Sequence, residues 1–193
     1  MNKKGKDLDP GRILTASGGY WEGFTIHAAV KLGIFDQLGD DARTAREVAE
    51  SLGGASRGVA MLLEALLSMG FVERVGERFR CGEMAREFLC SDSPRSLVQI
   101  INHHSNLVES WHRLDESILS GGPVRQRASE AGDQEREAFL LGMFNLAMLQ
   151  APTMTKAIDL SGRKSLLDLG GGPGTWAIHF CLENPELRAT VFD

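Results

Sequence analysis

The sequence predicts a mainly α-helical N-terminal domain of the winged-helix type, followed by the opening β-α-β unit of a Rossmann-like α/β domain. The first part is predicted by the order of elements over residues 44–81, where two short helical segments precede two β-like runs joined by a tight turn. The second part is predicted by an apolar run at 164–169 that leads into four glycines, a helical segment and a further apolar run.

Composition and charge limit the functional class. The chain has 193 residues, of which 42% are hydrophobic and 24% charged, and its net charge is −5. An acidic chain has no overall positive field to collect nucleic acid or anionic lipid, so we expect neither nucleic acid nor a membrane as a partner. No apolar run approaches the roughly 20 residues of a membrane helix, so we expect a cytoplasmic protein. The spacing of Cys81, Cys90 and Cys181 fits no zinc site, and we expect reduced thiols and no bound metal.

The first helical segment is long and apolar. Between Ile13 and Leu38, apolar residues recur at helical intervals. We therefore expect a helix that buries much of its surface and ends near Gly33.

Capping and turn residues define the winged helix that follows. Thr44 and Glu47 are spaced as a capping box, in which the hydroxyl accepts a backbone N–H and the carboxylate reaches back to the cap, so a short helix should begin there. Ser56 is expected to cap a second helix, which Gly70 ends as a left-handed terminator. The two β-like runs on either side of Gly76 and Glu77 predict a hairpin.

Two further helical regions are expected in the middle of the chain. The first runs from about 96 to 119 and ends at the Gly-Gly-Pro of residues 121–123. Polar residues 124–135 predict a loop. Apolar residues then resume at helical spacing over 135–158, with a bend expected near Pro152.

Two adjacent histidines, His103 and His104, lie in the first of these regions. Adjacent residues on a helix do not face each other, so we do not expect them to share a metal ion. They are assigned ordinary capping or exposed positions.

The glycine-rich loop is the main functional signal. Residues 166–174, LLDLGGGPG, place Asp168 just before the glycines, and Asp193 follows the next predicted strand. As a pattern, the loop fits both a dinucleotide site and an S-adenosylmethionine site. A carboxylate beside the loop would repel a pyrophosphate but would favour the sulfonium and ammonium of S-adenosylmethionine. Asp193 stands where such folds accept hydrogen bonds from ribose hydroxyls. The charge favours S-adenosylmethionine, with NAD and a turn without any ligand as alternatives.

Four stretches of the chain together resemble the small-molecule O-methyltransferases of the caffeate and acetylserotonin type. These stretches are GYWEGFTIHAAVKLGIFDQL, TAREVAESLGGASRGVAMLLEALLSMGFVE, ESWHRLDESILSGGP, and LLDLGGGPG with NPELRATVFD. The resemblance runs from about Ile13 to Asp193. It implies a class I S-adenosylmethionine enzyme with an N-terminal winged-helix dimerisation domain, which acts as a homodimer on a small-molecule hydroxyl.

The resemblance also implies roles for particular residues. The cofactor is expected to contact Asp168, Gly170, Gly171, Gly172, Gly174 and Asp193. The methyl acceptor is expected to contact Asn102, Leu107, Phe139 and Met143. For Leu107, Phe139 and Met143, simple helix packing is an equally good interpretation, because an apolar stripe at helical spacing is usually core.

The same resemblance divides the chain into three parts. Residues 11–100 would form the dimerisation domain, 101–160 the connecting helices that wall the substrate pocket, and 161–193 the start of the cofactor-binding domain. The family's catalytic base is a histidine far downstream of the ribose acid, so no catalytic residue is assigned here. We expect this chain to be the N-terminal portion of an enzyme and inactive alone.

Two alternatives belong to other functional classes. A winged helix is also typical of DNA-binding regulators, in which the second helix enters the major groove. That helix carries one base, Arg57, beside the acid Glu64 and many apolar residues, which suits a subunit interface better than DNA. The other alternative is a non-catalytic dimerisation module.

Overall fold

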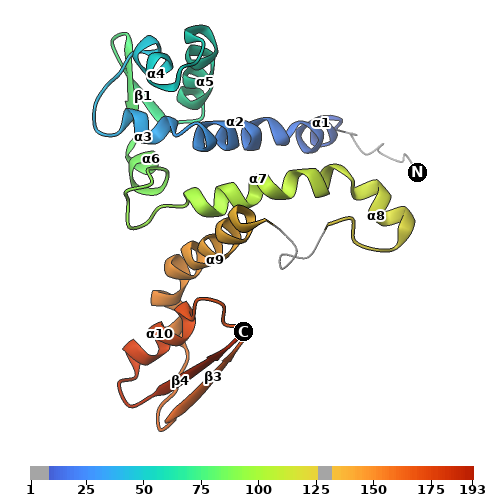
Figure 1. Cartoon of the computed structure of the whole chain (residues 1–193), viewed down its shortest axis with the longest axis vertical. Coiled ribbons are helices and arrows are strands. Elements are labelled where there is room, and N and C mark those ends of the chain that lie inside the picture. The colour runs from blue at the N-terminus through green and yellow to red at the C-terminus, as the bar shows by residue number, and fades with distance from the viewer. Residues whose placement is uncertain (1–8, 126–131) are drawn as a thin grey trace, which may run out of the picture.

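The computed structural model describes residues 9–125 and 132–193. The elements follow one another in a mainly helical order with two small sheets (Figure 1). They are α1 (Gly11–Gly18), α2 (Tyr20–Lys31), α3 (Ile34–Leu38), α4 (Ala45–Leu52), α5 (Ser56–Ser68), β1 (Val72–Val75), β2 (Arg78–Cys81), α6 (Glu83–Phe88), α7 (Val98–His112), α8 (Leu114–Ser120), α9 (Asp133–Met154), the 3-10 turn η2 (Thr155–Ala157), β3 (Ser165–Leu169), α10 (Thr175–Glu183) and β4 (Arg188–Phe192).

The N-terminal core forms where α3, α4 and α5 pack against the antiparallel pair of β1 and β2. Its fully buried side chains include Ile34, Phe35, Leu38, Val48, Leu63, Leu66 and Val72. The capping box of α4 is confirmed, because the Thr44 hydroxyl accepts from the Glu47 N–H and the Glu47 carboxylate accepts from the Thr44 N–H. The helix-helix-hairpin order predicted from the sequence is therefore the order that builds this core.

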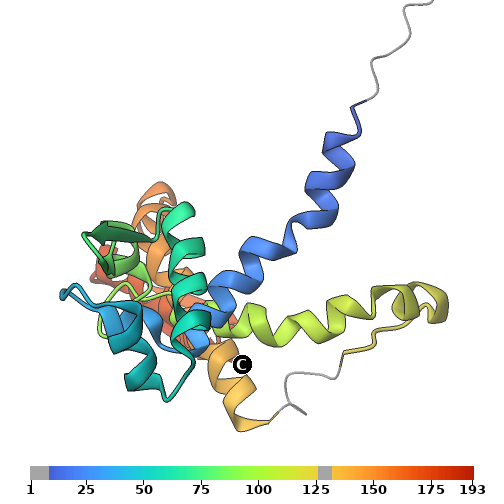
Figure 2. The ribbon, with the colours of Figure 1, turned by 90° about the horizontal axis from the view of Figure 1, so that it is seen from above.

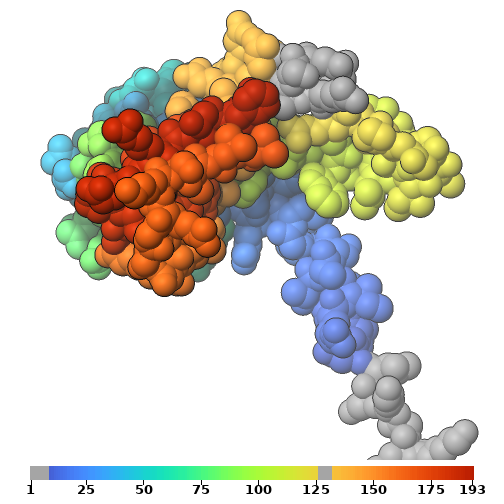
Figure 3. Space-filling view, turned by 90° about the horizontal axis from the view of Figure 1, so that it is seen from below, coloured from blue at the N-terminus to red at the C-terminus, as the bar shows by residue number. Residues whose placement is uncertain are grey.

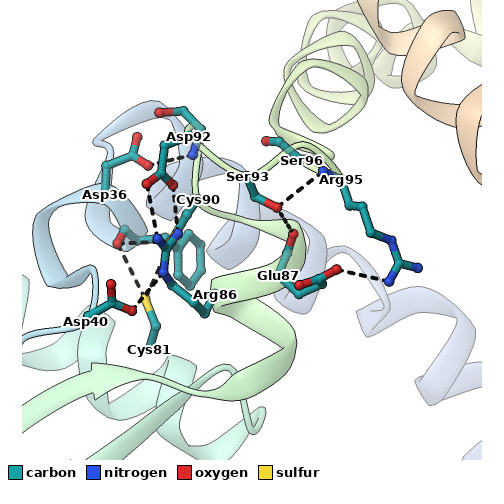
Figure 4. A network of polar contacts seen from close by, with 12 residues as sticks. Asp36, Asp40, Cys81, Arg86, Glu87, Cys90, Asp92, Ser93, Arg95 and Ser96 are labelled. Carbon is teal, nitrogen blue, oxygen red and sulfur yellow. Dashed lines mark hydrogen bonds and ion pairs between the residues drawn. The ribbon is translucent and has the colours of Figure 1, made fainter.

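Side-chain contacts attach α6 to the rest of this domain (Figure 4). The Arg86 guanidinium donates to Asp40 and, through two nitrogens, to Asp92. Beneath it the Cys81 and Cys90 thiols, 4.0 Å apart, both donate to the backbone carbonyl of Phe35. Burial raises the pKa of the Cys81 thiol to about 12, so this thiol stays protonated at neutral pH. The three cysteines are free thiols.

Two details of this region differ from the sequence prediction. The segment expected to be one buried helix ending near Gly33 is two helices, α1 and α2. Helix α2 ends at Lys31, close to the predicted end, and its buried residues are Ala29 and Val30. Trp21 is 66% exposed. The periodicity predicts helix correctly but predicts burial wrongly, because an apolar stripe does not show whether another part of the same chain covers it. Ser56 is also not the cap of α5: Ala55 takes that position in an extended conformation, and Ser56 begins the helix.

The long helices α7 and α9 pack against each other; α7 also packs on α2 of the N-terminal part, and α9 packs on α10 of the C-terminal part. The region predicted as one helix to residue 119 is divided at Arg113 into α7 and α8. Helix α9 begins at Asp133 and contains Pro152 near its C-terminal end, where η2 follows. Part of the loop predicted at 124–135 lies outside the described residues. Seen from above and from below, α1 and α8 extend away from the rest of the chain (Figures 2 and 3).

The C-terminal unit is β3, α10 and β4. The two strands are parallel and pair Ser165 with Arg188 through to Leu169 with Phe192, while α10 packs on both strands and on α9. This is the β-α-β unit predicted from the sequence. In the part of the chain that the structure describes, no helix has the length and apolar character needed to cross a membrane.

Candidate active site

The glycine-rich loop lies between β3 and α10, at the carboxyl ends of the two parallel strands. The Gly170 N–H donates to the Phe192 carbonyl at 2.7 Å, which ties the start of the loop to the end of β4. Gly170, Gly172 and Gly174 have φ values of 71°, 50° and 73°. A residue with a side chain rarely adopts such angles, so the alternation of glycines in the sequence is what permits this path.

Asp193 lies directly beside this loop. Its carboxylate accepts a hydrogen bond from the Gly172 N–H at 2.7 Å through Oδ2, although the two residues are 21 positions apart. The parallel pairing of β3 and β4 brings both to the same sheet edge, where ligands bind in open α/β folds. Oδ2 retains a second lone pair and Oδ1 takes no part in this bond. The carboxylate can therefore still accept from a ligand's hydroxyl groups.

Asp168 supplies a second carboxylate under the loop. A Cβ added at Gly171 would lie 2.6 Å from both Cγ and Oδ2 of Asp168, so the loop backbone passes immediately over the acid. Oδ2 of Asp168 is buried and has no hydrogen-bond partner in the described structure. A buried, unpaired carboxylate oxygen is costly, which indicates a missing donor or cation.

A hollow of about 400 Å³ opens between this loop and α9. It is lined by Phe139, Leu140, Met143, Leu146, Ala147, Gln150, Gly170, Gly171, Gly172, Pro173, Thr175, Trp176 and Asp193. The α9 side is mainly apolar and the loop side carries backbone groups and an acid. Among the residues that the structure describes, the buried Thr175 hydroxyl at the start of α10 also finds no hydrogen-bond partner.

These features can be tested against the two cofactors that the loop pattern allows. Of the described residues that line the hollow, none is a lysine or an arginine, whereas Asp193 lines it and Asp168 lies beneath its glycine wall. A dinucleotide would bring the two negative charges of its pyrophosphate against these acids. S-adenosylmethionine carries a sulfonium and an ammonium, which the same acids stabilise, and has ribose hydroxyls that suit Asp193. The residues present fit S-adenosylmethionine.

Comparison with known proteins identifies the family. The O-methyltransferase dimerisation domain matches residues 14–91, and the O-methyltransferase domain matches residues 120–193. The chain belongs to the O-methyltransferase family. The 3-hydroxy-5-methyl-1-naphthoate 3-O-methyltransferase of Streptomyces sahachiroi is 29% identical to it over 193 residues, which are 95% of this chain and 55% of that protein.

Solved structures show the same fold. An O-methyltransferase family protein from Burkholderia thailandensis aligns with a TM-score of 0.84 and 26% identity, over 95% of this chain and 56% of that one. Human N-acetylserotonin methyltransferase, solved in complex with S-adenosylmethionine, aligns with a TM-score of 0.81 and 23% identity, over 98% of this chain and 61% of that one. The chain thus spans a little over half the length of these proteins. The family supports the methyltransferase interpretation over the DNA-binding and purely structural alternatives.

The four residues predicted to contact the methyl acceptor do not all lie in one hollow of this O-methyltransferase chain. Phe139 and Met143 lie on the α9 face that borders the glycine loop. Asn102 instead lines a polar hollow between α2, α7 and α9, together with Lys31, Gln99, Asn106 and Glu137. Leu107 lines a third hollow, beside Trp111 and Leu114. In the described part of the chain, Asn102 and Leu107 are therefore not brought to the loop.

Other residues at this site of the O-methyltransferase chain were missed or misplaced. Gln150 lines the hollow and follows Phe139, Met143 and Leu146 at helical spacing, so the same stripe would have predicted it. Leu146, which the family resemblance places at a substrate position where plant enzymes tend to carry a histidine, also lines the hollow. No pattern indicated Thr175 or Trp176. His103 is buried, with only 6% of its surface exposed, which corrects its assignment to a capping or exposed position. Within the described residues, no cluster of three or more metal-binding side chains occurs.

Proposed function

We propose that this chain forms the dimerisation domain and the methyl-donor side of an S-adenosylmethionine-dependent O-methyltransferase that acts on a small-molecule hydroxyl. One observation carries the proposal: a glycine-rich loop lies between two carboxylates, Asp168 and Asp193, beside a hollow whose α9 side is mainly apolar. S-adenosylmethionine supplies the electrophilic methyl group when bound. Family membership and the named relatives support this chemistry.

Each part of the hollow has a proposed task. Gly170, Gly171, Gly172 and Gly174 let the backbone approach the methionine part of the donor, and Asp193 accepts from its ribose hydroxyls. Asp168 stabilises the donor's positive charge. Phe139 and Met143 on α9 hold the acceptor against the donor and exclude water, because transfer needs the two reactants at attack distance. The same proposal takes residues 11–100 as the dimerisation domain, 101–160 as the connecting helices and 161–193 as the first part of the donor domain.

Donor binding is tested by calorimetric titration of S-adenosylmethionine, and separately of NAD, into the 193-residue chain. We expect S-adenosylmethionine to bind and NAD not to bind. Asp193→Ala should weaken the binding by about tenfold, the usual effect of losing a charge-assisted hydrogen bond. Asp159→Ala is the matched control, since Asp159 is an exposed acid whose Oδ1 accepts a hydrogen bond from the Ser161 N–H at 2.9 Å. Binding of NAD in place of S-adenosylmethionine, or equal loss in both variants, would contradict the proposal.

We also propose that the chain assembles as a homodimer through the exposed apolar residues of its helical arms. These residues are Ile13, Leu14, Tyr20, Trp21 and Phe24 on α1 and α2, and Trp111, Leu114, Ile118 and Leu119 on α7 and α8. Leu119 is 87% exposed. Large apolar side chains left exposed in such number on two helical arms suit an interaction site, and the matching family domain is a dimerisation domain.

Sedimentation velocity tests this surface. We expect the chain to sediment as a dimer, and the double variant Trp21→Glu, Leu119→Glu to sediment as a monomer, because two charges would be buried without partners. Leu182→Glu, an exposed apolar position on α10, is the control and should leave the dimer intact. A wild-type monomer would contradict the homodimer, and a dimer that survives the double variant would show that the interface lies elsewhere.

A further inference from the structure

Helices α7 and α9 cross at a point fixed by a glycine. A Cβ added at Gly142 would lie 3.1 Å from the Cα of Ile100 and 3.2 Å from its Cδ1, and Ile100 is itself buried. A glycine inside a helix destabilises it, so its presence here is explained by the close approach of the two backbones. The crossing therefore leaves little freedom in the separation of the two helices.

One helical turn from this crossing, His103 of α7 packs on Phe139 of α9. The ring centroids are 5.2 Å apart and the planes are tilted by 55°. Because 103 follows 100 while 139 precedes 142, the two helices run antiparallel through both contacts. Phe139 thus has the imidazole on one side, and it also lines the hollow that faces the glycine loop.

The chemistry of His103 suits a packing role on an aromatic ring. Burial lowers its pKa, and the charges of Arg125 and His104 lower it further, so the ring is neutral at pH 7. A neutral imidazole presents a flat, rigid face to a neighbouring aromatic ring, and such tilted pairs prefer particular orientations. A flexible aliphatic side chain at the same place would fill space without fixing the direction of the Phe139 ring.

We propose that His103 is a positioning residue of the methyl-acceptor site, which acts by holding the Phe139 ring against the hollow at a depth that the Ile100–Gly142 crossing determines. This inference rests on the proposed function of the hollow. According to this inference, the affinity for the acceptor depends in part on His103, which is not among the residues that line the hollow.

The first test is acceptor binding, with 1-naphthol as the probe, titrated calorimetrically into the 193-residue chain saturated with S-adenosylhomocysteine. We expect His103→Ala to weaken naphthol binding about three- to tenfold while the affinity for S-adenosylhomocysteine stays unchanged. His103→Phe, which keeps a flat ring, should restore it. His104→Ala, an adjacent and exposed position, should have no effect. Unchanged naphthol binding in His103→Ala, or equal loss of both ligands, would overturn the inference.

The second test needs no ligand. Phe139 is labelled as 4-fluorophenylalanine, and the fluorine spectrum is recorded for the wild-type chain, His103→Ala and His104→Ala. We expect one line in the wild type and in His104→Ala, and a shifted and broadened or divided signal in His103→Ala. An unchanged line in His103→Ala would overturn the positioning role. If S-adenosylhomocysteine or naphthol fails to bind the wild type, the proposed function fails, and the fluorine spectrum still decides the role of His103.

Discussion

Replacing Gly171 with alanine is expected to reduce the affinity for S-adenosylmethionine by about a hundredfold or more, a loss of about 2.7 kcal/mol or more. The added methyl group would lie 2.6 Å from the Cγ and Oδ2 of Asp168, so either the loop backbone or the carboxylate must move. Both form part of the proposed donor site. Any rearrangement that relieves the contact therefore disturbs that site. For this reason the expected loss of affinity for S-adenosylmethionine is larger than the loss expected for Asp193→Ala.

The measurement is calorimetric titration of S-adenosylmethionine, with circular dichroism to show that the variant remains folded. Gly58→Ala is the matched control, because Gly58 lies on α5, far along the chain from the loop, and a Cβ there meets nothing within 4 Å. That variant should bind normally and unfold at slightly higher urea, since alanine favours a helix. Normal binding by Gly171→Ala would show that the contact with Asp168 does not shape the donor site.

Elements set by local sequence were predicted well. The capping box of Thr44 and Glu47 and the turn at Gly76 involve residues that interact within a few positions of each other. The unit of β3, the glycine loop and β4 was also predicted, because parallel strands joined by one helix have few alternative arrangements. The proximity of Asp193 to the loop follows from that arrangement, not from sequence distance.

The wrong predictions concern burial and neighbours, and they share a different cause. Both properties depend on contacts between segments that are far apart in the sequence. Trp21 has the periodicity of a buried helix, yet periodicity cannot say whether the covering surface belongs to the same chain. The neighbours of Asn102 and the burial of His103 depend on how α7 meets α2 and α9. The fit of Ile100 against Gly142 fixes that crossing. A glycine within an apolar helical stripe is the sequence feature that indicates such a close approach, and it does not say which helix lies opposite.

Replacing Leu63 with alanine is expected to lower the free energy of unfolding by about 3 kcal/mol, which is a large share of the roughly 5–15 kcal/mol of a typical domain. Leu63 is 0% exposed and belongs to the core of the N-terminal domain, so truncation removes buried methyl groups and leaves a cavity. Urea denaturation should show a lower midpoint with little change in slope.

Met61 provides the comparison that isolates burial from helix propensity. It lies two residues earlier on α5 and is 63% exposed, so Met61→Ala should change the free energy of unfolding by no more than about 0.5 kcal/mol. Both variants must be measured at one protein concentration, because dimerisation would make the apparent stability depend on concentration. Equal midpoints for the two variants would mean that α5 does not bury Leu63, and the core that supports the proposed dimer surface and α7 would have to be assigned differently.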